Sequence, residues 1–296
     1  MRMFAVGSLM GLVLLTGCGG SDKATGPSLE QQAKQAMAIA APEARTTKLI
    51  AVAAKQQQAG DSVGASASLA QAAESAKIVD KPGAKVRSLC AVVVALQGNG
   101  DAKSLLKLAS KSLDEVQDAK EKAGATARYA LALGKTMKEA DKAKSYLKSA
   151  TDDAGKIELP EDKAGALLEL ASAYEQLEES EQAKALTTAA SEAAKTIADG
   201  RKKCETLAAV GLALSKMKQA ETSKQAFDEA IAEAGKISDA MNQSYAYLEI
   251  SNRLITAGNK EAAKPLLEKA ALKAEKVDAS LRGTLVESID KAKAKT

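Results

Sequence analysis

Residues 164–197 read AGALLELASAYEQLEESEQAKALTTAASEAAKTI, and their apolar side chains recur at helical spacing. A first stripe, at positions i, i+3, i+4 and i+7, consists of Leu167, Leu170, Ala171 and Tyr174. This spacing places the four side chains on one face of a helix. After a polar stretch at 178–180, a second stripe consists of Ala183, Leu186 and Ala190. The stretch therefore predicts two amphipathic helices joined by a short turn.

The same pattern occurs six times along the chain. Six alanines each lie seven residues before a valine or isoleucine, and they are Ala72, Ala109, Ala150, Ala190, Ala230 and Ala270. The steps between them are 37, 41, 40, 40 and 40 residues. A lone helical hairpin cannot bury its apolar face, so repeats of this length stack on their neighbours. We expect an all-α fold, an α-solenoid of about six hairpins.

The register of each repeat follows from where the stripe of its first helix begins. These starting residues are Leu49, Val86, Ala127, Leu167, Leu207 and Tyr247. The third stripe is irregular, because Gly134 occupies a site where most repeats carry a large residue. Prolines are expected at the start of three first helices and inside one second helix: Pro42, Pro82, Pro160 and Pro265.

The two ends of a stack need capping helices, because they lack a neighbour on one side. We expect one cap at residues 29–39 and another at residues 285–295, with Val286 and Ile289 facing inward. Cys90 and Cys204 lie in different predicted helices, and we expect buried thiols there; a disulfide between them is the alternative.

The stripe residues of the fourth repeat resemble the tetratricopeptide repeat (TPR). The matching residues are Leu167, Leu170, Ala171, Tyr174, Ala183 and Ala190. The resemblance covers about residues 44–282, with units of about 40 residues where the family commonly has 34. It implies a right-handed α-solenoid whose first helices line a concave groove that receives a peptide or a partner helix.

In that family, the site one residue beyond the start of each first-helix stripe faces the groove. Here those sites are Arg87, Arg128, Leu168, Ala208 and Leu248. Further partner-binding candidates on the same faces are Glu169, Glu175, Lys216, Glu249 and Asn252. We expect Arg87 and Arg128 to offer two guanidinium groups to a carboxylate. For any one of these residues, a solvated helix face is the alternative.

Composition argues against several kinds of chemistry. The chain has 42 Lys and Arg, 38 Asp and Glu and no His, and 7 of its 296 residues are aromatic. The near balance of charge does not favour nucleic acid as a partner. Without His there are no imidazole metal ligands and no Ser-His or Cys-His catalytic pairs. Because no catalytic or metal-binding spacing is found either, we expect no enzyme activity, no cofactor and no metal.

The N-terminus has the pattern of a targeting segment. Arg2 precedes an apolar run over residues 4–14, which is too short to span a bilayer, and LTGC follows at 15–18. LTGC resembles the lipobox of bacterial lipoproteins. The resemblance implies a signal peptide over residues 1–17, lipidation of Cys18 and a flexible tether over residues 18–28, ahead of a repeat domain at 29–296. Gly19, where that family's inner-membrane signal is Asp, implies an outer-membrane location facing the periplasm.

Together these patterns predict a lipid-anchored scaffold that binds a protein partner in the bacterial cell envelope. Two alternatives remain open from the sequence: an envelope hydrolase that uses carboxylates, and a purely structural surface or spacer lipoprotein.

Overall fold

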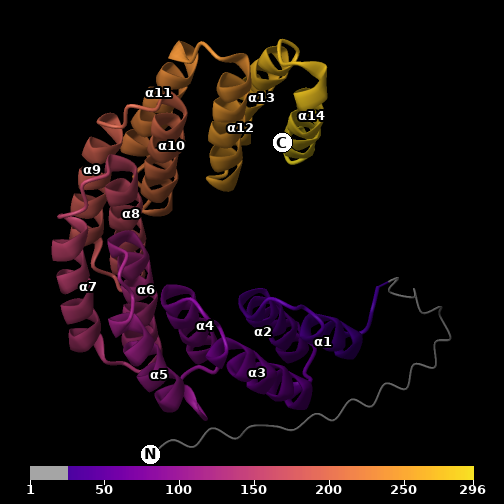
Figure 1. Cartoon of the computed structure of the whole chain (residues 1–296), viewed down its shortest axis with the longest axis vertical. Helices are drawn as coiled ribbons and strands as arrows, with labels where there is room; N and C mark the ends of the chain where they lie inside the picture. The colour runs from indigo at the N-terminus through magenta and orange to yellow at the C-terminus, as the bar shows by residue number, and fades with distance from the viewer. Residues whose placement is uncertain (1–25) are drawn as a thin grey trace, which may run out of the picture.

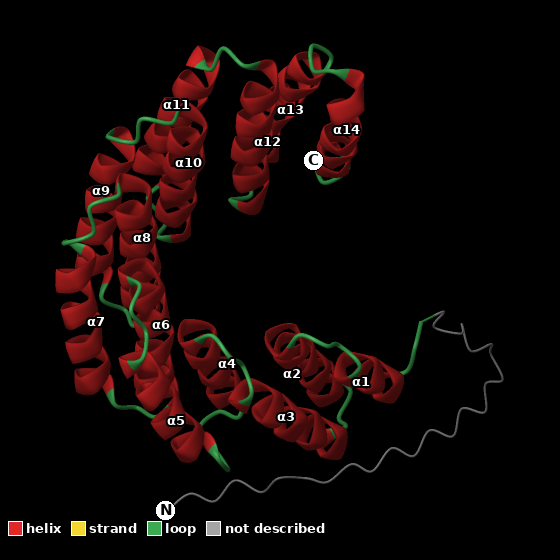
Figure 2. Ribbon diagram, in the orientation of Figure 1, coloured by secondary structure: helices red, strands yellow, loops and turns green. Residues whose placement is uncertain are grey.

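The computed structural model describes residues 26–296 as fourteen α-helices and one π-helical turn, with no strand among them (Figure 2). The predicted signal peptide, Cys18 and most of the predicted tether lie outside the described residues. The first helices of the six repeats are α2 (Pro42–Gln58), α4 (Pro82–Ala95), α6 (Ala119–Leu131), α8 (Pro160–Gln176), α10 (Gly200–Lys216) and α12 (Ala240–Thr256). The second helices are α3 (Ser62–Lys77), α5 (Ala102–Asp114), α7 (Ala140–Ala154), α9 (Ser180–Lys195), α11 (Ala220–Lys236) and α13 (Lys260–Ala274).

The helices stack into an open C (Figure 1). Each first helix packs on its own second helix and on the first helix of the next repeat, and each second helix also packs on the first helix of the next repeat, whereas successive second helices scarcely contact one another. The first helices therefore form a tight inner row on the concave side, and the second helices form a looser outer row. This arrangement confirms the expected α-solenoid of TPR-like hairpins.

Each helix begins at a recognisable local signal. Asp and Asn side chains accept the N–H of the third helical residue at several starts, namely Asp61, Asp118, Asp199, Asp239 and Asn259. Pro42, Pro82 and Pro160 are the first residues of α2, α4 and α8, as expected. Before each second helix, at least one residue adopts positive φ, and these include Gly60, Gly100, Lys138, Glu178, Lys218 and Gly258.

Counting from the residue that caps each first helix corrects the expected register of two repeats. Leu49, Leu167, Leu207 and Tyr247 all lie eight residues after the cap. The equivalent residues of the second and third repeats are Leu89 and Thr126. The expected starts at Val86 and Ala127 were therefore wrong by three residues and by one.

The error has two structural causes. The caps of α5 and α6, Asp101 and Asp118, are 17 residues apart, where the other repeats have 19 or 20, so α5 is short. The caps of α6 and α7, Asp118 and Glu139, are 21 residues apart instead of 20. The additional residue is accommodated by the π-helical turn η1 (Ala132–Thr136), which continues directly from α6.

Small residues permit close contacts within and between hairpins. A Cβ on Gly211 would lie 2.9 Å from the ring of Phe227, so α10 approaches α11 too closely for a side chain there. A Cβ on Gly134 would lie 2.6 Å from Cδ2 of Leu177. The large side chain missing at Gly134 is thus replaced by one from the end of the next first helix.

The two ends are capped as expected, with one exception. The helix α1 (Leu29–Met37) packs on α2 and α3, and α14 (Ala279–Lys293) packs on α13 and α12. Leu285 and Ile289 are buried, but Val286 is 38% exposed, so its expected inward orientation was wrong. Pro265 lies inside α13, as expected. Within residues 26–296, no helix combines the length and the apolar character that crossing a membrane requires.

Candidate binding trough on the inner face

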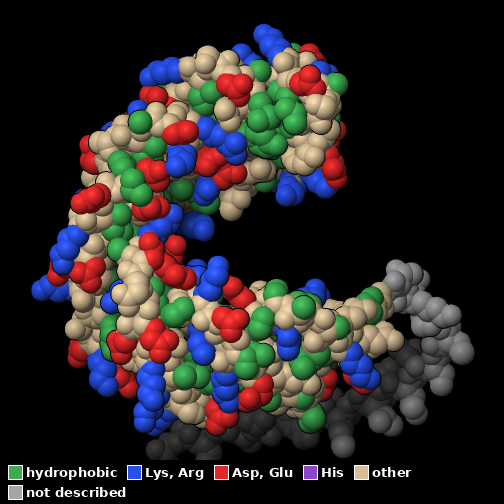
Figure 3. Space-filling model, viewed as in Figure 1, with side chains coloured by type: hydrophobic (Ala, Val, Ile, Leu, Met, Phe, Trp, Pro, Cys, Tyr) green, Lys and Arg blue, Asp and Glu red, His purple; other side chains and the backbone are tan. Residues whose placement is uncertain are grey.

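Two adjoining hollows lie along the inner row of helices. The smaller one, of about 330 Å³, is named the basic hollow and is lined by Arg87, Cys90, Ala91, Val94, Arg128, Leu131, Lys135 and Gln176. The larger one, of about 530 Å³, is named the central hollow and extends over α6, α8 and α10 to Arg253 of α12. Both are lined by Arg128, Leu131 and Gln176, so they form one trough. Figure 3 shows charged side chains of both signs on the concave side of the molecule.

The trough is built from equivalent positions of successive first helices. The position ten residues after the cap carries Ala51, Ala91, Arg128, Glu169, Ala209 and Glu249, none of them fully buried. In the third to fifth repeats, the position seven residues further along carries Lys135, Gln176 and Lys216, on the same helix face two turns away. Of these residues, all but Ala51 and Glu249 line the central hollow or the basic hollow.

Five of the seven expected partner-binding residues lie in the trough. They are Arg87, Arg128, Glu169, Glu175 and Lys216. Glu249 pairs with the trough residue Arg253 at 2.8 Å without itself lining a hollow, and Asn252 lines neither hollow. Arg87 and Arg128 share the basic hollow, but they occupy different positions of their repeats, because the position of Arg87 is held by Gly124 in α6.

The expected groove sites of the fifth and sixth repeats were wrong. Ala208 is fully buried and Leu248 is 6% exposed. The groove-facing position is one residue further along, at Ala209 and Glu249.

Three residues of the basic hollow, Val94, Lys135 and Gln176, were not predicted from the sequence. The signal for the last two was their spacing, because each lies seven residues after a charged residue of the groove-facing position.

The charges of the trough are largely without partners inside the molecule. Among residues 26–296, five side chains in it make no ion pair: Arg128, Lys135, Glu169, Glu175 and Lys216. Arg87 reaches Glu121 at 3.5 Å. Oε2 of Glu175 and Nε of Arg253 are buried and have no hydrogen-bond partner in the described chain. Buried polar atoms are normally paired, so these atoms mark a place where donors and acceptors are missing.

An edge of the inner row shows the opposite arrangement. Lys120 pairs with Asp162 at 2.8 Å, and Lys202 pairs with Glu161 at 2.8 Å, which links α6 to α8 and α8 to α10. The hydrogen bond from Lys202 lowers the pKa of Glu161, and Glu161 raises the pKa of Lys202. These charged side chains are already paired with side chains of neighbouring repeats.

Cys90 and Cys204 are buried free thiols, as expected. Burial raises the pKa of Cys90 to about 12, against the opposing effect of the Arg128 charge, and burial likewise raises the pKa of Cys204 to about 12. A thiol with such a pKa is protonated near neutral pH, and the thiolate is the reactive form. Cys90 therefore contributes an apolar surface to the basic hollow.

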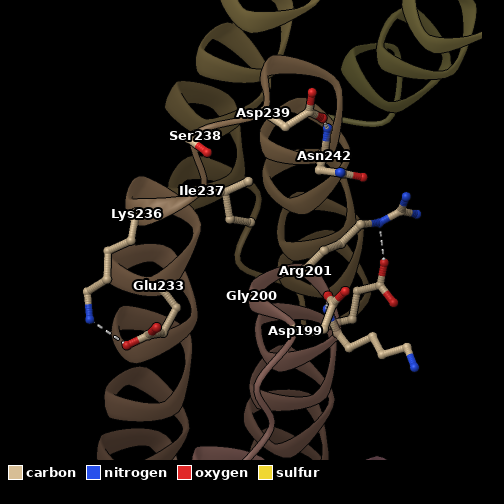
Figure 4. A pocket seen from close by; sticks show the side chains of 11 residues that line it. Asp199, Gly200, Arg201, Glu233, Lys236, Ile237, Ser238, Asp239 and Asn242 are labelled. Carbon is tan, nitrogen blue, oxygen red and sulfur yellow. Dashed lines mark hydrogen bonds and ion pairs between the residues drawn. The ribbon is translucent and has the colours of Figure 1, made fainter.

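A third hollow, of about 640 Å³, lies where α10 and α12 begin and α11 ends (Figure 4). Its charged side chains already have partners. Arg201 pairs with Glu205 at 2.8 Å and Lys236 pairs with Glu233 at 2.6 Å, while Asp199 and Asp239 cap helices. Although it is larger, this hollow offers few free groups to a ligand.

No cluster of three or more His, Cys, Asp or Glu residues suited to a metal ion occurs in residues 26–296.

Comparisons with known proteins give a sparse result. No protein-family model and no curated protein matches the chain. A solved structure, Ton1535 from Thermococcus onnurineus NA1, is 14% identical with a TM-score of 0.41, over 88% of this chain and 94% of that one. Another is a crystal structure of nearly identical TPR-like repeats attributed to a kinesin light chain of Podosopora anserina. It is 15% identical with a TM-score of 0.39, over 67% of this chain and 98% of that one. The class assigned here, an α-solenoid of TPR-like hairpins, rests on the stacked hairpins themselves.

Proposed function

We propose that this protein is a lipid-anchored scaffold that binds a protein partner along its inner trough, in the cell envelope of a bacterium. The observation that carries this proposal is the set of charges in the trough that make no ion pair within residues 26–296, on three successive first helices and η1. Charged groups left free along a preformed concave surface favour a complementary partner, because they gain contacts there at little ordering cost.

A scaffold role fits the chemistry of the trough better than catalysis does. Its two acidic side chains, Glu169 and Glu175, line the same hollow as Arg128, Lys216 and Arg253, and the thiol at Cys90 is protonated. Stacked hairpins present a broad, rigid surface, which suits recognition of a polypeptide segment.

The anchor part of the proposal rests on the sequence LTGC at 15–18. Two or more acyl chains on Cys18 hold a protein stably at a membrane, and the tether then raises the local concentration of the trough near other envelope components. Labelled palmitate is expected to enter the wild-type protein but not Cys18→Ser. An unlabelled wild type whose membrane fraction does not change with Cys18→Ser contradicts the anchor.

A photo-crosslinking experiment tests the scaffold part. A photoreactive residue replaces Ser172, which lines the central hollow, or Ser145, which is exposed on the outer helix α7. We expect one protein to be crosslinked in intact cells from position 172 and not from position 145, and to be lost when Glu169→Lys is added.

Equal crosslinking from both positions indicates a spacer with no preferred face. Clearing of cell-wall material in a zymogram by the purified protein, abolished by Glu175→Gln, indicates a hydrolase. Either outcome contradicts the scaffold.

A further inference from the structure

We propose that the two hollows of the trough recognise opposite charges on one segment of the partner. An acidic residue beside an aliphatic one enters the basic hollow, and a basic residue of the same segment reaches Glu175 in the central hollow. This inference rests on the proposed scaffold function and specifies the partner's chemistry.

The basic hollow selects for a carboxylate by its charge. Its three charged lining residues, Arg87, Arg128 and Lys135, are all cationic, and no carboxylate of residues 26–296 lines it. The nearest acidic contact is that of Arg87 with Glu121, at 3.5 Å. Three cations around one hollow repel each other, and a carboxylate placed between them relieves the repulsion and accepts charge-assisted hydrogen bonds.

The floor of the basic hollow selects for an aliphatic neighbour. It consists of Cys90, Ala91, Val94 and Leu131, and Val94 is 49% exposed. Covering the exposed side chain of Val94 with an apolar group of the partner would be favourable, because it removes apolar surface from water. The equivalent position of the fourth repeat carries the polar Ser172, which has no such preference. The volume of about 330 Å³ holds side chains rather than a folded domain.

In the central hollow, the acceptor that lacks a partner belongs to Glu175. Oε2 of Glu175 is buried without a hydrogen-bond partner, and the side chain makes no ion pair in residues 26–296. Leaving a buried acceptor oxygen unpaired is costly, and an incoming ammonium or guanidinium group that donates to it removes that cost. Lys216 and Arg253 line the same hollow, but neither pairs with Glu175, so its carboxylate remains available to a basic side chain of the partner.

The π-helical turn links the basic hollow to the irregular repeat. Lys135 lies in η1, the turn that accommodates the one additional residue of the third repeat. Single π-turns inside helices occur frequently at functional sites. Lys135 keeps the spacing of seven residues from Arg128 that Gln176 keeps from Glu169, and it is the third cation of the basic hollow.

Selection from a random peptide library tests the inference. Phage-displayed 16-residue peptides are selected on the purified full-length chain in detergent. We expect enrichment of Asp or Glu next to Leu, Ile, Val or Met, with Lys or Arg at a fixed distance. A synthetic consensus peptide is expected to bind about tenfold or more weakly to Arg87→Glu/Arg128→Glu, the loss expected for a charge-assisted contact.

Each charge reversal is expected to change only its own position of the consensus. Selection on Arg87→Glu/Arg128→Glu exchanges the acidic position for a basic one, and selection on Glu175→Lys exchanges the basic position for an acidic one. Lys103→Glu/Lys107→Glu on the outer helix α5 carries the same change in net charge as the Arg pair, and Glu221→Lys on α11 matches Glu175→Lys. Both controls are expected to leave the consensus unchanged.

If a reversed variant fails to show a wild-type circular dichroism spectrum, the neutral Arg87→Gln/Arg128→Gln takes its place, with the same loss of binding expected. The inference is overturned if the library yields no enriched peptide, or if the charged positions of the consensus are the same on the charge-reversed variants as on wild type. If the selected peptides stop binding to Ser172→Arg but bind the charge variants as they bind wild type, the charge inference is overturned and the scaffold proposal is supported. If they bind Ser172→Arg and the charge variants as they bind wild type, both the inference and the scaffold proposal are contradicted.

Discussion

The fourth to sixth repeats and the second and third repeats solve the same packing problem in different ways. From α8 to α13, each helix cap follows the previous one by 20 residues, and equivalent positions carry similar side chains. From α4 to α7 the chain loses three residues in α5 and gains one in η1. Stacking tolerates both changes, because the three missing residues amount to about one helical turn and the added residue widens a single turn.

The difference between the two regions separates what holds the stack together from what shapes its surface. The regular repeats keep large core residues and small contact residues in phase. The irregular repeats bring Arg87, Arg128 and Lys135 around one hollow, which no single periodic row would do. Places where a natural protein departs from its own regular pattern tend to be functional sites. The basic hollow lies at such a place, the irregular second and third repeats.

The largest expected loss of stability comes from removing a core side chain of the regular repeats. Leu170→Ala removes a fully buried side chain from α8, and we expect the free energy of unfolding to fall by about 2–5 kcal/mol. Denaturant unfolding followed by circular dichroism measures this loss. Leu272→Ala, on a side chain that is 60% exposed, is the control and is expected to change stability by less than about 0.5 kcal/mol. Equal losses from the two variants would show that the stack does not depend on this core.

A second pair of substitutions compares close contacts in the two regions. Gly211→Ala places a methyl group against the buried ring of Phe227, and we expect a loss of about 1–3 kcal/mol. Gly134→Ala meets the end of the half-buried Leu177 side chain, which can turn aside, and its Cβ would lie 3.3 Å from Cβ of Ala143, a tight but smaller conflict. We therefore expect a loss of about 1 kcal/mol or less. Thermal and denaturant unfolding of both variants give the order, and a larger loss at Gly134 contradicts it.

Relief of backbone strain in a regular repeat gives a smaller effect. Lys218 adopts a φ of 59° before α11, where Gly258 takes the equivalent place before α13. Lys218→Gly removes a left-handed non-glycine residue but adds freedom to the unfolded chain, so we expect a net gain of about 0.5 kcal/mol. The reverse exchange, Gly258→Lys, is expected to destabilise. A Lys218→Gly variant less stable than wild type in urea contradicts this account.

The smallest expected effect concerns the ion pair between α8 and α10. The pKa of Glu161 is lowered in the folded protein, so the pair contributes stability above the unfolded pKa of the carboxyl, and that stability is lost as pH falls through the lowered value. Lys202→Gln is therefore expected to be slightly less stable than wild type near neutral pH in low salt, and the difference is expected to shrink as pH falls through the lowered pKa of Glu161. Thermal melts across that range test the sign. A difference that grows at low pH contradicts it.

Much of the fold was predictable from the sequence. Apolar stripes and small residues indicated the six hairpins, both capping helices and the register of four repeats, because those repeats keep a constant length. The register of the second and third repeats was not predictable from stripes alone, since a deletion and an insertion move the stripe without removing it. The steps of 37 and 41 residues around Ala109 indicated both changes, but not the helix in which each lies.

The candidate site was predictable in part. Arg87, Arg128, Glu169, Glu175 and Lys216 were found because their positions relative to the apolar stripe place them on the groove side of first helices. Lys135 was missed although its spacing of seven residues from Arg128 was a signal, because the register of the third repeat was not known from the sequence. The buried Oε2 of Glu175 also depends on how neighbouring helices enclose it, which only three-dimensional packing determines.

The loose outer row has a mechanical consequence. Since second helices of successive repeats scarcely contact one another and are linked only through the first helices, bending the stack changes few direct contacts between second helices. Because the curvature of a solenoid is the sum of the rotations between its repeats, a small rotation in the same sense at every interface would change the separation of α1 and α14. Such a molecule can adjust its curvature to the length of what it holds while each hairpin stays intact.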